Sequence, residues 1–257
     1  MFIIDDSTGN DVLLPSGMER GYDPSQVIHA MFAPPSQIPM IPESEWIPRI
    51  RDRKQYKMGL RDLFRAGKVG NVKDQNGQGF CWAYSVTRTC EYVRAAMNLE
   101  HNPLSAHSVA CKVKNFRDEG GWCGLSAQYI RNSGVVPESL WPAKSMSRGY
   151  DTPSNWEEAK KYVITEDWVD LTSAVYDQNL TWGQVVSCLL QNIPCAVDFN
   201  WWGHSVCAVD VDEVDGEVAL DIDNSWTPSW GDNGTARLQG SRKIPNGAVA
   251  TRVLNPS

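Results

Sequence analysis

Hydrophobic and polar positions divide the chain into an irregular beginning, a helical middle and a strand-rich end. From residue 81 to residue 97, apolar side chains recur at steps of three and four, which predicts an amphipathic helix with one buried face. A second helix is predicted at 104–115, where Ser105 can cap the N-terminus, and a third at 123–132, which Gly134 ends.

The order of the later elements predicts the fold class. Two capping boxes, Ser154 with Glu157 and Thr181 with Gln184, predict further helices. The segments that follow are short, β-branched and partly alternating, which is typical of strands: IPCAVDFN, HSVCAVDVD, EVALDID, TARLQ and AVATRVL. Helices first and strands later indicate an α+β protein with a helical lobe, a β lobe of antiparallel sheet or barrel, and a site in the cleft between them.

The first 57 residues differ from the rest of the chain. Their prolines break any long helix or central strand, and we expect an extended arm over 1–57. The apolar run at 31–42 is too irregular to form a core alone, so it is expected in a groove of its own cleft, its own domain or a neighbouring subunit. The domain itself is expected at 58–257, with the helical lobe at 58–150 and the β lobe at 151–257.

Composition and charge exclude several classes of partner. An apolar content of 42% in 257 residues is enough for a real core. The formal charge of -7, with acids and bases interspersed, leaves no basic footprint for nucleic acid or an anionic membrane. No basic region precedes a long apolar run at the N-terminus, and no run of about eighteen apolar residues occurs. We therefore expect a soluble protein without a secretory signal peptide.

Seven cysteines, none in a CxxC pair, indicate neither a complete disulfide framework nor a zinc site. Cys81 stands out because it follows the glycines Gly77 and Gly79 and begins the predicted helix. Unpaired N–H groups and the helix dipole both favour a thiolate at that position. The alternative is a small buried hydrophobic residue, as most cysteines are.

A hairpin signal brings a second pair of side chains together. Asp215 and Gly216 lie between two apolar runs, which predicts a tight β-hairpin. A three-residue loop at 213–215 would place His204 and Asn224 opposite one another across the open end. A histidine and an amide would then be neighbours at the edge of the sheet.

Three separate stretches resemble the papain-like cysteine peptidases. Gln75 precedes Cys81, which Trp-Ala-Tyr-Ser follows; NSW stands at 224–226 and WGDNG at 230–234. The resemblance covers about residues 58–254, and the spacings from Cys81 to His204 and Asn224 are near the roughly 130–150 residues of that family.

The chain departs from the family pattern beside the nucleophile. The family's usual Cys-Gly-Ser-Cys-Trp reads Gln-Gly-Phe-Cys-Trp here, with Phe80 before the nucleophile. The family's disulfide would need cysteines where this chain has Gln78 and Asp118. Because both are absent, we expect a reducing compartment such as the cytoplasm, or a virion.

The resemblance implies a catalytic role for each matching residue. Cys81 would be the nucleophile, His204 the base that takes its proton, and Asn224 the group that orients His204. The Gln75 side chain and the Cys81 backbone N–H would form the oxyanion hole. Trp226 would shield the histidine–asparagine bond from water.

The remaining site residues are also implied by the family. Trp82 would support the site, and Gly120 and Gly121 would present their backbone to an extended substrate, the alternative being a plain tight turn. Neither a metal nor an organic cofactor is required. The expected partner is a polypeptide substrate, cleaved through a Cys-His-Asn acyl-enzyme.

Two other functions remain open at this level. The proline-rich arm, SEW at 44–46 and the 74–82 stretch also resemble papain-like proteins of tailed phages, where the chain would be a decoration or cement component of the virion and residues 1–57 would contact neighbouring subunits. A cell-wall amidase with a cysteine nucleophile shares the order of Cys and His but does not account for Gln75, NSW or WGDNG.

Overall fold

The computed structural model describes residues 1–27, 38–164, 168–172 and 177–251. The helices are α1 (Asn10–Leu13), α2 (Trp46–Tyr56), α3 (Leu60–Arg65), α4 (Cys81–Ala96), α5 (Ala106–Val113), α6 (Cys123–Ser133), α7 (Pro153–Ala159) and α8 (Gln178–Leu189). The strands are β1 (Ile3–Ile4), β2 (Val169–Asp170), β3 (Cys195–Phe199), β4 (His204–Val214), β5 (Glu217–Asp223), β6 (Thr235–Leu238) and β7 (Gly247–Ala250).

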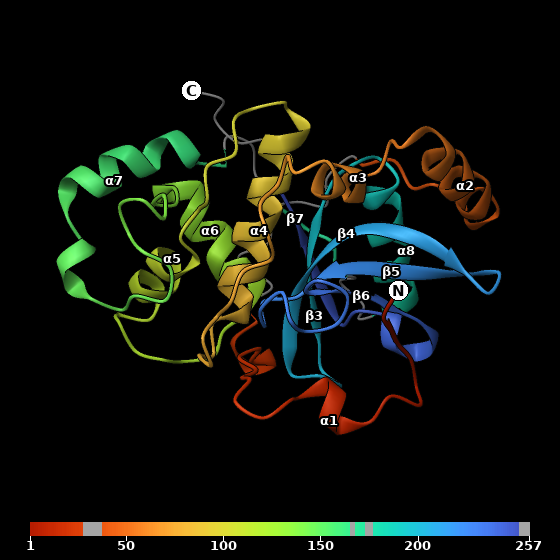
Figure 1. The fold of residues 1–257 in the computed structure, drawn as a ribbon, viewed down its shortest axis with the longest axis horizontal. Helices are drawn as coiled ribbons and strands as arrows, with labels where there is room; N and C mark the ends of the chain where they lie inside the picture. Colours follow the sequence, from red (N-terminus) through yellow and green to blue (C-terminus); the bar gives the residue numbers. More distant parts are fainter. Residues whose placement is uncertain (28–37, 165–167, 173–176, 252–257) are drawn as a thin grey trace.

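The expected α+β fold with a helical part and a largely antiparallel sheet is confirmed. The described residues form one sheet of seven strands in the order β1-β6-β5-β4-β3-β7-β2, in which only the β1–β6 pair is parallel. Helices α4 to α7 gather on one side of the molecule and the sheet on the other, with α4 at the boundary (Figure 1). Within the described residues, no helix has both the length and the apolarity that crossing a bilayer needs.

Two of the predicted helix ends are confirmed. Helix α5 begins after Ser105, whose side chain accepts a hydrogen bond from Ser108 N. Helix α6 ends at Gly134, whose φ of 78° is a conformation that glycine adopts at little cost.

Both predicted capping boxes are wrong. Helix α7 is capped by Thr152, because Pro153 at its first position needs no backbone donor. Helix α8 begins four residues earlier than expected and is capped by Asp177, which accepts from two backbone N–H groups. In each case a side-chain oxygen upstream of the predicted cap residue accepts the hydrogen bonds from the N–H groups of the first turn.

Helix α4 is buried around its whole circumference, not on one face as predicted. Every side chain from Cys81 to Ala95 is buried, including the charged Arg88 and Glu91. One side of the helix packs on α5 and α6 and the other on β3 and β4. The apolar stripe was therefore only part of the buried surface.

The hairpin joins β4 and β5 through a turn of two residues rather than three. Val214 pairs with Glu217, and a register shift near Ala208 leaves Cys207 paired with Asp223. Continued by one residue, this register places Asn224 opposite Val206 rather than opposite the histidine.

The first 57 residues contain more regular structure than an extended arm. Strand β1 adds to β6, and α2 is a helix of eleven residues. Its Trp46 and Ile50 belong to the hydrophobic cluster formed by the sheet and α8, which we call the sheet-side core. Pro48 does not prevent this helix because it lies in the first turn, where its missing N–H has no partner to lose. Of the run 31–42, residues 31–37 lie outside the described part, and Ile41 is buried in the same core.

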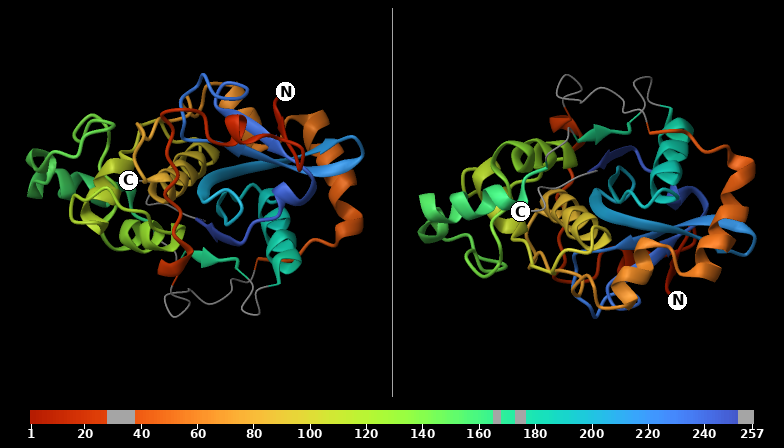
Figure 2. Two further views of the ribbon diagram at one scale, coloured as in Figure 1. Left: turned by 90° about the horizontal axis from the view of Figure 1, so that it is seen from below. Right: turned by 90° about the horizontal axis from the view of Figure 1, so that it is seen from above.

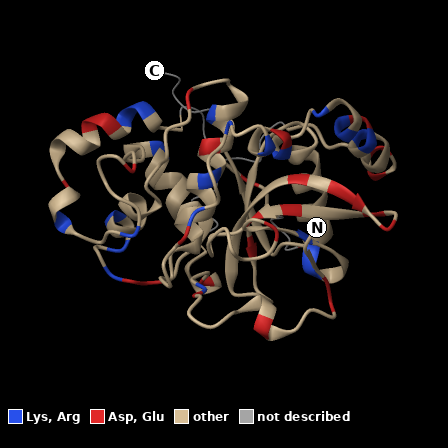
Figure 3. Ribbon diagram, in the orientation of Figure 1, with Lys and Arg blue, Asp and Glu red and all other residues tan. Residues whose placement is uncertain are grey.

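Charged residues of α2 lie beside acidic residues of the β4–β5 hairpin (Figure 3). The three ion pairs are Arg51–Glu213, Arg53–Asp210 and Lys54–Asp212. Two of these three cations are largely exposed, so these pairs attach the helix with little stabilisation of their own.

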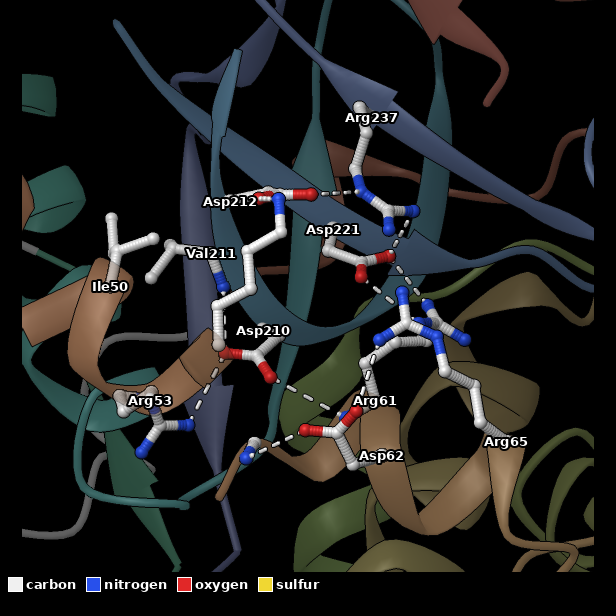
Figure 4. Close-up of a pocket in the computed structure, with 12 residues that line it drawn as sticks. Ile50, Arg53, Arg61, Asp62, Arg65, Asp210, Val211, Asp212, Asp221 and Arg237 are labelled. Carbon is white, nitrogen blue, oxygen red and sulfur yellow. Dashed lines mark hydrogen bonds and ion pairs between the residues drawn. The ribbon is translucent and has the colours of Figure 1, made fainter. Parts of the chain in front are cut away.

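A second set of ion pairs is buried between α3, α4 and the sheet. Arg61 binds both oxygens of Asp221 at 2.6 and 2.9 Å and Oδ1 of Asp223 at 2.6 Å. Arg88 of α4 binds Asp223 Oδ2 at 2.8 Å. Figure 4 shows Arg61 and Arg237 directed at the same Asp221 carboxylate. Only about 40 Å³ remains free there, so these residues form a packed contact rather than a ligand site.

We expect Arg88→Met to lower the free energy of unfolding by about 3–5 kcal/mol, because the buried carboxylates of Asp223 and Glu91 each lose one of the two cations that pair with them. Arg51→Met, which breaks an exposed pair by the same change of side chain, is expected to leave the stability nearly unchanged. Denaturant unfolding of the two variants measures the difference. Equal midpoints would show that the buried pairs do not hold the two parts together.

Candidate active site

Cys81 is the first residue of α4 and its side chain is fully buried. The loop before it is held without a disulfide, since Asp118 Oδ1 accepts a hydrogen bond of 2.8 Å from Gly79 N. The carboxylate of Asp118 thus connects the two segments that a disulfide joins in the usual family pattern. The ring of Phe80 packs edge-on against Trp82 and His107, at centroid distances of 6.5 and 5.3 Å.

His204 and Asn224 come together at the start of β4 and just past the end of β5. His204 Nε2 lies 2.8 Å from Asn224 Oδ1. The indole of Trp226 stacks on the imidazole with centroids 4.5 Å apart, and Trp202 meets it edge-on at 5.0 Å. Trp202, which the sequence did not single out, therefore helps Trp226 to hold the ring and to exclude water.

The amide of Gln75 is oriented by the strand that carries Asn224. Gln75 N donates to Ser225 O at 2.9 Å, and Ser225 Oγ donates to Gln75 Oε1 at 2.5 Å. The Nε2 group donates one N–H to Gln78 O at 2.6 Å, which leaves its second N–H for a ligand. Ser225 is a positioning residue that belongs to the NSW motif but that the sequence did not identify.

His107 supports the same loop. It is fully buried on α5, where Nδ1 lies 2.8 Å from Tyr84 OH and Nε2 pairs with Gln78 Oε1. Burial lowers the pKa of His107 to about 4, so the ring is neutral at physiological pH. Trp82 adds a hydrogen bond of 3.0 Å from Nε1 to Gly79 O.

Part of the N-terminal arm lies directly on these residues; we call residues 19–23 the covering segment. Gly21 N donates to Cys81 Sγ at 3.3 Å, and Tyr22 N donates to Gly203 O at 3.2 Å, just before the histidine. In Figure 2 the arm, in red, crosses the boundary between the yellow and green helices and the blue and teal strands. The segment therefore contacts the cysteine side and the histidine side of the site at once.

The covering segment pairs with the glycine pair by backbone hydrogen bonds. Gly121 N donates to Gly21 O and Asp23 N donates to Gly121 O, both at 2.8 Å, in a parallel arrangement. Gly120 O accepts a hydrogen bond of 3.1 Å from Gln26 Nε2. The glycine backbone thus does receive an extended peptide, in this case the chain's own.

The segment also takes up the donors of the expected oxyanion hole. Glu19 O accepts from Gln75 Nε2 at 3.0 Å and from Trp226 Nε1 at 2.9 Å. The fit admits only glycine above the thiol, because a Cβ on Gly21 would lie 2.0 Å from Gly79 O.

Under this cover the cysteine and the histidine are both electrically neutral. Burial raises the pKa of the Cys81 thiol to about 11, and hydrogen bonds from Ser205 and Gly21 lower it by less. Burial lowers the pKa of His204 to about 3, against the opposing bond to Asn224. His204 Nδ1 is buried and has no hydrogen-bond partner among the described residues. The ring therefore has a free acceptor in its neutral form.

The described residues contain no group of three or more His, Cys, Asp or Glu side chains placed to bind a metal ion. All seven cysteines are free and buried. The side chains of the site carry a thiol, an imidazole and two amides.

Comparison with known proteins identifies the family. The family model of the papain family cysteine proteases matches residues 57–255, which is most of the chain. The chain belongs to the papain family of cysteine proteases. Its relatives are named cysteine proteases and endopeptidases, and the chain is a cysteine endopeptidase of this family.

Individual relatives are distant. Mexicain of Jacaratia mexicana is 27% identical over 192 residues, covering 69% of this chain and 86% of mexicain. Chymopapain of Carica papaya is 28% identical over 187 residues, and the match covers 67% of this chain and 52% of chymopapain. The chain thus spans most of one relative and about half of the other.

Solved structures share the papain-like fold. Procathepsin L 3 of Tenebrio molitor has a TM-score of 0.61 at 21% identity, covering 74% of this chain and 68% of that one. Xylellain of Xylella fastidiosa has a TM-score of 0.61 at 17% identity and covers 93% of this chain and 97% of its own. The second match is long enough to include part of the first 57 residues. These relatives give no support to a phage-encoded origin or to a role in a virion.

We expect Gly21→Ala to lift the covering segment and so to make Cys81 reactive at neutral pH. In the wild type the alkylation rate should keep rising as the pH approaches about 11, because the thiolate forms only near that pKa. In the variant the rise should shift to lower pH, with a rate at pH 7 that is higher by about tenfold or more. Iodoacetamide labelling followed by mass spectrometry measures the rate at Cys81.

Gly149→Ala is the matched control, since it adds a methyl group to an exposed glycine far from the covering segment in sequence. It should label like the wild type. Identical pH profiles for all three proteins would mean that residues 19–23 do not control the thiol.

Proposed function

We propose that this papain-family enzyme cleaves polypeptides through an acyl-enzyme on Cys81, with His204 and Asn224 as its partners, and that the covering segment inhibits it. The observation that carries the proposal is the backbone of residues 19–23 itself. An extended peptide already lies on Cys81 Sγ, on Gln75 Nε2 and on the backbone of Gly121. The groove therefore has the contacts that a substrate backbone needs.

In the proposed reaction each step is assigned to one group of the site, which becomes available when the segment lifts. His204 Nδ1 accepts the thiol proton, and the imidazolium is oriented by its bond to Asn224 Oδ1. The thiolate attacks the peptide carbonyl, and Gln75 Nε2 with the Cys81 backbone N–H stabilises the oxyanion. The imidazolium then protonates the leaving amine, and water attacks the thioester with His204 as the base.

The covering segment binds in a way that prevents its own cleavage. At Cys81 it presents the N–H of Gly21, not the carbon of a carbonyl group, so the sulfur faces a donor. The carbonyl that reaches Gln75 belongs to Glu19, two residues away from that contact. The peptide thus occupies the donors and the thiol without placing a bond for attack.

A reducing compartment is the setting that we propose for the enzyme, because seven buried thiols remain free. The proposed substrate is an extended polypeptide.

We expect the full-length wild-type chain to hydrolyse a fluorescently labelled unfolded protein slowly, and Gly21→Ala to hydrolyse it at least about tenfold faster. Adding Cys81→Ala to Gly21→Ala should abolish the activity because the nucleophile is gone. The release of labelled fragments measures all three proteins.

A point substitution tests the segment more cleanly than deletion of residues 1–57, which would also remove Ile4, Trp46 and Ile50 from the core. Gly149→Ala serves again as the control and should match the wild type. Persistence of hydrolysis in the Cys81→Ala protein would contradict the assignment of the nucleophile. If Gly21→Ala made Cys81 reactive but not hydrolytic, peptide cleavage would have to be given up.

The role of Gln75 is tested in the Gly21→Ala chain, where the amide no longer binds Glu19. Gln75→Ala should lower kcat by about a hundredfold to a thousandfold with a smaller effect on KM, because the lost bond is strongest in the transition state. Gln191→Ala, which removes an exposed amide after α8, should leave both constants unchanged. An unaltered kcat for Gln75→Ala would exclude this amide from the oxyanion hole.

A further inference from the structure

A buried histidine that takes no part in the reaction steps lies behind residues 75–80, which we call the oxyanion loop. His107 belongs to α5 and is fully buried. The rings of Phe80 and Tyr84 meet its imidazole edge-on, at centroid distances of 5.3 and 5.6 Å. Burying an imidazole is costly unless its nitrogens have hydrogen-bond partners. Both nitrogens of His107 have one, and one of these partners belongs to the oxyanion loop.

The partners of His107 fix which ring nitrogen carries the proton. Nε2 lies against Gln78 Oε1, an amide oxygen that can only accept, so Nε2 is the donor. Nδ1 is then the acceptor, and Tyr84 OH lies 2.8 Å from it. The pKa of about 4 keeps the ring neutral, so it has a single N–H. His107 therefore presents one directed donor, and this donor binds Gln78.

Gln78 connects this donor to the expected oxyanion hole. Its backbone O accepts a hydrogen bond of 2.6 Å from Gln75 Nε2 and another of 2.8 Å from Phe80 N. The amide group of Gln75 is planar, so a bond to one N–H fixes the direction of the other. That other N–H now binds Glu19 O and would later bind the oxyanion. Its direction thus depends on the position of the Gln78 carbonyl.

Hydrogen bonds hold the oxyanion loop at the two positions where the usual family pattern has a disulfide. All seven cysteines of this chain are free. Gln78 binds His107 instead, and Asp118 accepts its bond of 2.8 Å from Gly79 N. A hydrogen bond is much weaker than a covalent bond, so the position of this loop depends on each of these side chains.

We propose that His107 is a positioning residue for the oxyanion hole and that it holds the Gln75 amide in place through Gln78. This role rests on the proposed peptidase function and adds a residue on which its rate depends. Loss of His107 would leave the thiol and the base where they are but would let the oxyanion loop shift. A displacement of about 1 Å can cost about a hundredfold in rate.

The test uses the full-length Gly21→Ala chain as the parent and measures kcat and KM on a peptide amide with a fluorogenic leaving group. His107→Leu should lower kcat by about tenfold or more and change KM by less than about twofold, because the oxyanion forms only in the transition state. His107→Gln, whose amide nitrogen can reach the place of Nε2, should keep kcat within about threefold of the parent. His107→Asn reaches only the place of Nδ1 and should lose activity as His107→Leu does.

Two combinations show whether the effect passes through Gln78 and Gln75. Gln78→Leu, at a half-buried position, removes the same hydrogen bond from its other end and should lower kcat as His107→Leu does. The double variant should then be no slower than either single variant. In a chain that also carries Gln75→Ala, where the donor is already gone, His107→Leu should lower kcat by less than about twofold.

Alkylation of Cys81 separates positioning from a general disturbance of the site. Iodoacetamide reacts by displacement at a saturated carbon and forms no oxyanion, so its rate at Cys81 should be the same in the parent and in His107→Leu. His101→Leu is the matched control, since it changes an exposed histidine in the loop before α5. It should leave kcat and KM as they are in the parent.

The outcomes distinguish the role of His107 from the function on which it rests. An unchanged kcat in His107→Leu and Gln78→Leu would overturn the role and leave the peptidase standing; if His107→Leu does not fold, Gln78→Leu alone decides. A loss that His107→Gln does not restore, or that slows alkylation of Cys81 to the same extent, would show that the ring only fills space and would also overturn the role. If the parent cleaves no peptide amide, both proposals fail.

Discussion

The ion pairs of Asp223 with Arg61 and Arg88 fix the geometry on which the site depends. Arg88 belongs to the helix that begins at Cys81, and Asp223 is the residue directly before Asn224. Burial alone would raise the pKa of Asp223, but the two guanidinium groups outweigh it and hold the pKa below its usual value. Sliding α4 along the sheet would separate these pairs, and leaving a buried charge unpaired costs several kcal/mol. The Cys81 thiol and the Asn224 amide therefore keep their relative positions, because the buried ion pairs next to them resist separation.

The sequence predicted the parts of the fold whose signals are local and failed where distant segments meet. The Asp215–Gly216 turn, the cap at Ser105 and the helix after Cys81 each depend on a few neighbouring residues, and each is present. The buried charges could not be predicted in this way, because an arginine such as Arg88 counts as a solvent-facing residue until its partner 135 residues away is known. The position of the covering segment has no periodic signal either, since it depends on the absence of a side chain at one glycine.

The covering segment is held at both ends by the body of the protein. Before it, β1 adds to the edge of the sheet at β6; after it, Ile41 and Trp46 enter the sheet-side core. Its departure from the site is therefore a local lifting of a loop and does not require the terminus to unfold. Because the segment is tethered, its effective concentration at the site is high, and a few backbone hydrogen bonds are enough to keep it in place.

The same contact determines the charge states of Cys81 and His204, the proposed catalytic pair. With the segment in place, water is excluded, and both groups take their neutral forms: the thiol with a pKa of about 11 and the imidazole with a pKa of about 3. A thiolate and an imidazolium need water or fixed dipoles around them to be stable. The covering segment excludes the water, and it also occupies hydrogen-bond donors of the site that would act as fixed dipoles. Lifting it returns water to His204 and frees Gln75 at the same time. The proposed inhibition therefore works by desolvating Cys81 and His204 as well as by blocking the substrate, and the glycine above the sulfur makes both possible.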